Sequence, residues 1–121
     1  MNEARLKTLI TVDELARLLD AQQAVVLLDV IDELGAAPED RPKIPRSLSV
    51  YLATDFSGKP TPASGRRPLP DISEFQSKAR SWGIGSDSIV VVYDNSGGAQ
   101  ASRAWWTLRW AGLATSISPP I

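Results

Sequence analysis

Apolar residues recur at helical spacing in three parts of this chain, and we expect a helix in each. The first covers Thr11–Asp20, where Thr11 and Glu14 have the spacing of a capping box. The second begins at Asp71, and the third covers Gln100–Ala111. The side chains expected to face the interior from the first two helices are Val12, Leu15, Leu18, Leu19, Ile72, Phe75, Ala79 and Trp82.

Uninterrupted apolar runs alternate with these helices. The runs AVVLLDV at 24–30 and SIVVVY at 88–93 are typical of strands buried on both faces, and LSVYL at 48–52 is a weaker candidate. TSIS at 115–118 could start another strand before two prolines interrupt it. The alternation predicts an α/β fold with a small parallel sheet and helices on both of its faces.

Composition limits the chemistry of the chain. Its 121 residues suit a single domain, 1–121, and its net charge of −1 favours neither a nucleic acid nor an anionic membrane surface as a partner. The absence of Cys and His excludes metal sites built on thiolates or imidazoles, and also nucleophiles activated by a histidine base. We expect no metal, no cofactor, no membrane span, no signal peptide and a cytoplasmic location.

The segment DNSGGAQ at 94–100 joins the clearest strand to the third helix. A glycine pair lets the backbone turn tightly with its amides pointing inward, and the helix adds free N–H groups and its positive dipole end. Together they form an anion nest. The candidate residues are Asp94, Asn95, Ser96, Gly97, Gly98, Ala99 and Gln100, with Arg103 one turn into the helix and within reach of the nest or of an acidic neighbour.

Three interpretations of this loop stay open from the residues alone. In the first, the loop is a turn that binds nothing, and Asp94 caps the helix. In the second, it binds phosphate or a sulfur oxyanion, although an ionised Asp94 would repel such a ligand. In the third, Asp94 is a phosphate-accepting nucleophile, but Ser96 stands where a second acid would be expected. Asp29 has the same shortcoming, because Ile31 follows it.

Several pieces of the chain, in order, resemble the N-terminal domain of two-domain rhodanese-type sulfurtransferases, which act on thiosulfate or 3-mercaptopyruvate. The pieces are TVDELARLL with VVLLDV, IPRSLSVYLATDFSG, GRRPLPDISEF, and WGIGSDSIVVVYDNSGGAQASRAWWTLRWAGL. The resemblance implies a rhodanese fold. In the catalytic domain of that family a Cys ends the equivalent strand and carries sulfur as a persulfide. Asp94 occupies that position here, which implies a non-catalytic domain that supports a catalytic rhodanese domain.

The chain departs from the family pattern at three places. Asp29-Val30-Ile31 replaces the usual Asp-x-Arg, and Lys43-Ile44-Pro45-Arg46 replaces His-Ile-Pro-Gly. The family also continues after the third helix with a strand, an Asp-Gly-Gly turn and a helix. We therefore expect a domain shortened at its C-terminus, lacking the last strand and helix, and able to self-associate through an exposed sheet edge.

Two further groups of residues are candidates for an interface between domains. Arg66 and Arg67 lie in a loop rich in Gly, Pro and Ser, either as solvated charges or against the catalytic half. Trp105 and Trp106 lie in the third helix with Trp110. Trp106 and Trp110 share a face, and we expect two of the three rings to pack in the core, unless one belongs to an interface.

Overall fold

The computed structural model describes residues 8–21, 24–32, 43–65, 67–95 and 97–118. Four strands form one parallel sheet with the spatial order β2-β1-β3-β4. The strands are β1 (Val25–Ile31), β2 (Leu48–Tyr51), β3 (Ile89–Tyr93) and β4 (Thr115–Ile117). The predicted α/β class and parallel sheet are confirmed, and the strands lie within about one residue of the expected runs.

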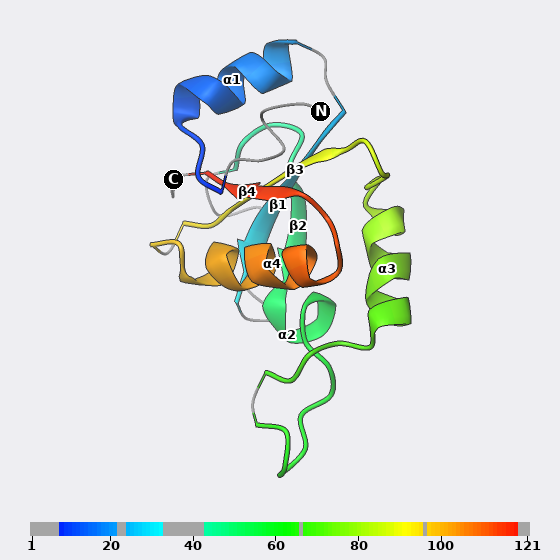
Figure 1. Ribbon diagram of the computed structural model, residues 1–121. Coiled ribbons are helices and arrows are strands. Elements are labelled where there is room, and N and C mark those ends of the chain that lie inside the picture. The colour runs from blue at the N-terminus through cyan, green and yellow to red at the C-terminus, as the bar shows by residue number, and fades with distance from the viewer. Residues whose placement is uncertain (1–7, 22–23, 33–42, 66, 96, 119–121) are drawn as a thin grey trace.

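Helices cover both faces of this sheet (Figure 1). Helix α1 (Val12–Asp20) lies on one face, and α2 (Leu52–Asp55), α3 (Ile72–Ser81) and α4 (Ala99–Trp110) lie on the other. Each face has its own apolar cluster, because successive strand residues point to opposite sides. The larger cluster, on the side of the three helices, includes Leu28, Val30, Val50, Phe75, Val90, Val92, Ala104 and Leu108; the smaller includes Leu15, Leu18, Leu27, Ile89, Val91 and Tyr93.

The first two helices begin as the sequence predicts. Thr11 and Glu14 form the complete capping box of α1, and the Asp71 side chain accepts a hydrogen bond from the Glu74 amide at the start of α3. The expected inward faces are wrong at one position in each helix, since Val12 and Ile72 are both exposed. Each is the first helical residue, and side chains on a helix lean toward its N-terminus. These two side chains therefore project past the packed part of the helix.

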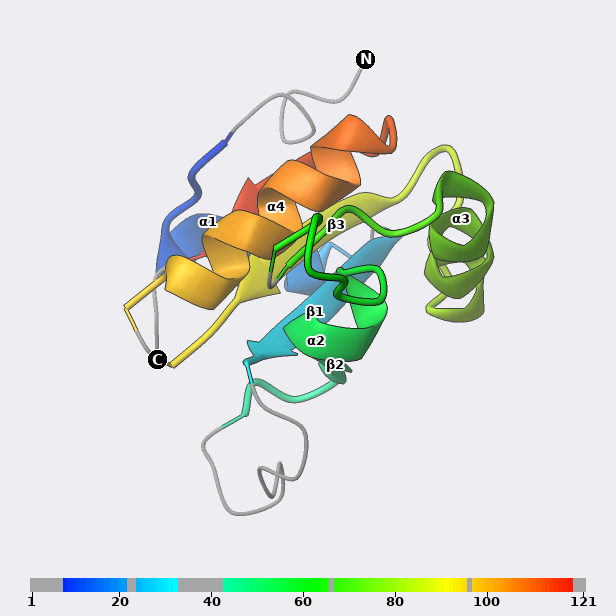
Figure 2. The same cartoon turned by 90° about the horizontal axis from the view of Figure 1, so that it is seen from below.

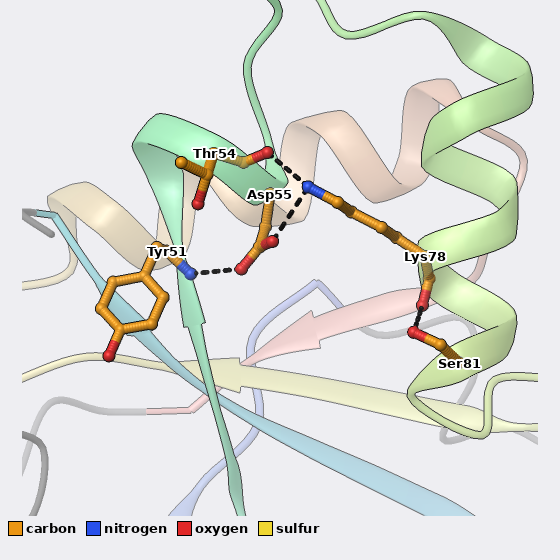
Figure 3. A network of polar contacts seen from close by, with 5 residues as sticks. All are labelled: Tyr51, Thr54, Asp55, Lys78 and Ser81. Atoms are coloured by element: carbon orange, nitrogen blue, oxygen red, sulfur yellow. Dashed lines mark hydrogen bonds and ion pairs between the residues drawn. The ribbon is translucent and has the colours of Figure 1, made fainter.

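The short helix α2 was not predicted from the sequence. Two hydrogen bonds and one ion pair hold it in place (Figure 3). Asp55 Oδ2 accepts a hydrogen bond from the Tyr51 amide at 2.8 Å, and Asp55 Oδ1 lies 3.0 Å from the Lys78 ammonium of α3. The same ammonium donates to the Thr54 carbonyl oxygen. One turn of helix is too short to show periodicity, so contacts from distant residues decide its presence.

The segment before α1 runs along the outer edge of β4. The Ile10 amide donates to the Ile117 carbonyl oxygen at 3.1 Å, and the Ile117 amide donates to the Thr8 carbonyl oxygen at 2.7 Å. These bonds cover part of the outer edge of β4, which leaves β2 at the opposite edge of the sheet. In the part of the chain that the structure describes, no helix is long and apolar enough to cross a membrane.

Candidate functional site

The loop between β3 and α4 lies at the carboxyl edge of the sheet, where parallel α/β folds place their ligands. Gly97 and Gly98 have φ angles of 88° and 96°, which side-chain-bearing residues rarely adopt. Gly98 is the N-cap of α4 and has no side chain to accept a hydrogen bond from the helix amides. The geometry therefore leaves a place for an acceptor at the helix start.

The Asp94 carboxylate occupies that place. Its Oδ1 atom accepts a hydrogen bond from the Gly98 amide, and its Oδ2 atom accepts one from the Ala101 amide, each at 2.8 Å. The residue is fully buried, directly after the buried strand β3. Both carboxylate oxygens thus accept hydrogen bonds from amides at the N-terminus of α4, which is the positive end of the helix dipole.

The other loop residues lie around this carboxylate. Asn95, Gly97 and Ala99 are exposed, whereas Gly98 and Gln100 are partly buried. Ser96, another candidate residue of the nest, lies outside the described residues. The bond from Ala101, in the first turn of the helix proper, was not anticipated, although its position three residues after the N-cap is the usual place for a capped amide.

Arg103 does not reach the nest. Its Nη2 atom donates to the carbonyl oxygens of Phe56 at 3.4 Å and of Arg67 at 3.2 Å. Burial, and to a smaller degree the nearby charge of Arg67, lower the pKa of Arg103. The side chain therefore ties two carbonyl groups of the segment after α2 to α4. In Figure 2, which views the molecule from below, α2 and α4 both lie in front of the sheet.

Arg67 lies at the same edge of the sheet. Its guanidinium forms an ion pair with Asp32, just after β1, with 3.1 Å between Nη2 and Oδ1. Arg67 is therefore a partly buried, paired side chain. Arg66 lies outside the described residues, so its interface role stays a prediction.

The expectation that two of the three tryptophans of α4 pack in the core is wrong, because one does. Trp106 and Trp110 share a face, as expected, but that face is turned to solvent, with exposed fractions of 46% and 39%. Only Trp105 packs against the core, and its Nε1 atom donates to the Thr115 carbonyl oxygen at 2.9 Å. Ala101, Ala104 and Leu108 face the sheet instead, since small side chains let the helix lie close to it.

Two of the three departures from the family pattern have structural counterparts. Asp29 is fully buried inside β1, between Ser49 and Tyr93 in the strand register. Arg46 has a φ of 74°, in the left-handed region where the family pattern has Gly, so this position is strained. Among the residues that the structure describes, no group of three His, Cys, Asp or Glu side chains could hold a metal ion.

Comparison with known proteins assigns the chain to a family. Residues 11–118 match the rhodanese-like domain, and the chain belongs to this family of domains. The chain is 39% identical over 116 residues to a Mycobacterium tuberculosis protein named "Putative thiosulfate sulfurtransferase SseB", covering 93% of this chain. It is 38% identical to a Pseudomonas aeruginosa protein named "Probable 3-mercaptopyruvate sulfurtransferase", covering 84% of this chain.

Solved structures agree on the fold. The 3-mercaptopyruvate sulfurtransferase from Leishmania major superposes with a TM-score of 0.77 at 22% identity, over 97% of this chain and 33% of that one. Tum1 protein from Saccharomyces cerevisiae gives a TM-score of 0.69 at 23% identity, over 94% of this chain and 40% of that one. The chain spans 41% of the length of each of the two sequence relatives. It therefore corresponds to one domain of longer proteins.

Proposed function

We propose that this chain is a non-catalytic rhodanese-like domain that works beside a catalytic rhodanese domain. The observation that carries the proposal is the Asp94 carboxylate in the nest at the end of β3, bonded to the Gly98 and Ala101 amides. The family resemblance gives this position to a persulfide-forming Cys in catalytic domains. A carboxylate has no sulfur to form a persulfide, and the sequence holds no Cys that could replace it.

The partner would supply the missing chemistry. The sequence relatives are more than twice as long as this chain, which leaves room in them for a second domain. We assign sulfur transfer from thiosulfate or 3-mercaptopyruvate to that catalytic rhodanese domain. Arg66, Arg67, Trp105 and Trp106 remain our candidates for contact with it. We also propose a cytoplasmic location, and self-association through the outer edge of β2.

The alternative is a free-standing module that binds an anion, or another partner, with the 94–100 loop. The buried carboxylate disfavours anion binding, because it already accepts two of the amides that an external anion would need. The same enclosure disfavours Asp94 as a nucleophile for phosphate. The structure thus supports a structural role for this side chain better than a ligand-binding or catalytic one.

A sulfur-transfer assay tests the proposal. The purified chain is incubated with thiosulfate and cyanide, and thiocyanate is measured, with the full-length Pseudomonas aeruginosa relative assayed in parallel. We expect the chain alone to form no thiocyanate above the protein-free rate. Turnover by this Cys-free chain that is lost on replacing Asp94 with Asn would contradict the proposal.

A further inference from the structure

Helix α4 presents its largest side chains to solvent. Trp106 and Trp110, one turn apart, are exposed by 46% and 39%, while Ala101 and Ala104 face the sheet. Two adjacent exposed tryptophans are costly in water, because each leaves a large apolar ring unburied. Such a pair on a soluble domain marks a contact surface.

A basic region continues this apolar surface. The Arg103 guanidinium carbon lies 5.8 Å from the centre of the Trp106 ring, and Arg103 bonds the Arg67 carbonyl oxygen. We call Trp110, Trp106, Arg103 and Arg67 the α4 strip. The α4 strip runs along α4 toward the carboxyl edge of the sheet. There, the Gly98 and Ala101 amides at the start of the helix donate hydrogen bonds to Asp94.

The α4 strip has a surplus of positive charge. Among the described residues its two guanidinium groups are balanced by one carboxylate, Asp32, which is paired with Arg67. The Arg103 Nε atom is buried and has no acceptor. Burial and, to a smaller degree, the charge of Arg67 lower the pKa of Arg103, so the two guanidinium groups repel each other. One further carboxylate beside them would balance the charge.

We infer that the α4 strip is the surface on which the catalytic rhodanese domain docks, with its rings buried by that domain and a carboxylate of that domain received beside Arg67 and Arg103. This inference rests on the proposed function and specifies its contact surface. Tryptophan and arginine are the residue types that most often dominate binding energy at interfaces, which fits this composition. The surface does not include the covered edge of β4. Of the four contact candidates named above, it leaves out Trp105, which packs against the core, and Arg66, which lies outside the described residues.

The test is to produce this chain together with the part of the Pseudomonas aeruginosa relative that lies outside the match, in one cell, and to measure co-purification. Affinity is then measured by calorimetry at two salt concentrations. We expect a one-to-one complex that weakens as salt rises, since charge contributes to the contact. We expect Trp106→Ser to weaken it about thirtyfold or more and Arg67→Gln about tenfold.

Matched variants separate docking from general damage. Leu48→Ser removes a side chain of similar exposure, 42%, from β2, and Lys59→Gln removes one positive charge from an exposed position in the same loop as Arg67. Both should bind as the parent chain does. If Trp106→Ser binds no worse than Leu48→Ser, or if the parent chain does not co-purify at all, the inference is wrong. Only thiocyanate formation by the chain alone would instead overturn its non-catalytic role.

Discussion

An aspartate side chain accepts hydrogen bonds from amides at the start of both α3 and α4, but one aspartate is exposed and the other is buried. Asp71 is exposed and accepts one bond, at 3.0 Å, from the Glu74 amide three residues later. Asp94 is fully buried and accepts bonds from amides four and seven residues later, at Gly98 and Ala101. The first is a local cap; the second fills a space that a strand, a glycine turn and a helix build together.

The difference shows what an anion nest does when the anion that it binds is a side chain of the same protein, here Asp94. Inward amides and a helix dipole stabilise negative charge, which in a catalytic rhodanese domain would favour a thiolate. Here they stabilise a carboxylate that holds the turn and the helix start in place. Under the proposed function, this loop keeps the backbone arrangement of a catalytic site, and Asp94 stands in place of the group that would react. Three substitutions measure how far the two aspartates differ.

Replacing Asp94 with Ala should have the largest effect. It leaves the Gly98 and Ala101 amides without their acceptor and removes two charge-assisted bonds. We expect a loss of about 3 kcal/mol in the free energy of unfolding, measured by urea denaturation. A loss below about 1 kcal/mol would show that water or backbone replaces the carboxylate easily, and that Asp94 is no more than an ordinary cap.

Replacing Gly98 with Ala should have an intermediate effect. A Cβ at this position meets nothing within 4 Å, so the cost comes from the φ of 96° alone. We expect about 1–2 kcal/mol of destabilisation by the same measurement. Gly85→Ala is the matched control, because Gly85 lacks a positive φ and its Cβ would lie 3.9 Å from Ser88 Oγ. Equal effects at both positions would argue against a strained turn at the nest.

Replacing Asp71 with Ala should have the smallest effect, about 1 kcal/mol, the usual value for loss of a helix cap. The exposed α3 start can exchange the lost bond for one with water, which the buried α4 start cannot do. Thermal denaturation followed by circular dichroism measures the difference between Asp71→Ala and Asp94→Ala. If Asp71→Ala lowers the stability as much as Asp94→Ala does, burial of the Asp94 carboxylate makes no contribution of its own to the stability.

The sequence was a good guide wherever the signal was local. Short-range patterns predict the strand runs and the capping residues Thr11 and Asp71, and the alternation of strands and helices predicts a parallel sheet. The spatial order of the strands was not predicted. The first residues of two helices, Val12 and Ile72, were predicted inward and lie outward, because periodicity does not show where packing ends. Helix α2 depends on Lys78, 23 positions beyond Asp55, and no local pattern signals that contact.

The candidate site was predictable in outline only. A buried strand followed by Asp and a glycine pair located the nest. The position of Arg103 could not be deduced, because the Phe56 and Arg67 carbonyl oxygens that hold it belong to a loop without periodicity. Helical spacing correctly placed Trp106 and Trp110 on one face, but spacing alone does not say which face meets the sheet. The small residues Ala101 and Ala104 on the other face were the signal that could have decided it.

The central claim is that the nest is filled by the chain's own carboxylate, and sulfate binding tests it most directly. Melting temperatures of the parent chain and of Asp94→Ala are measured in sodium sulfate and in sodium chloride at equal ionic strength. We predict a saturable stabilisation of Asp94→Ala by sulfate, because the emptied nest accepts an anion. The parent chain should show only the general, non-saturating stabilisation that sulfate gives to folded proteins. A specific, saturable stabilisation of the parent chain by sulfate, equal to that of the variant, would contradict the account.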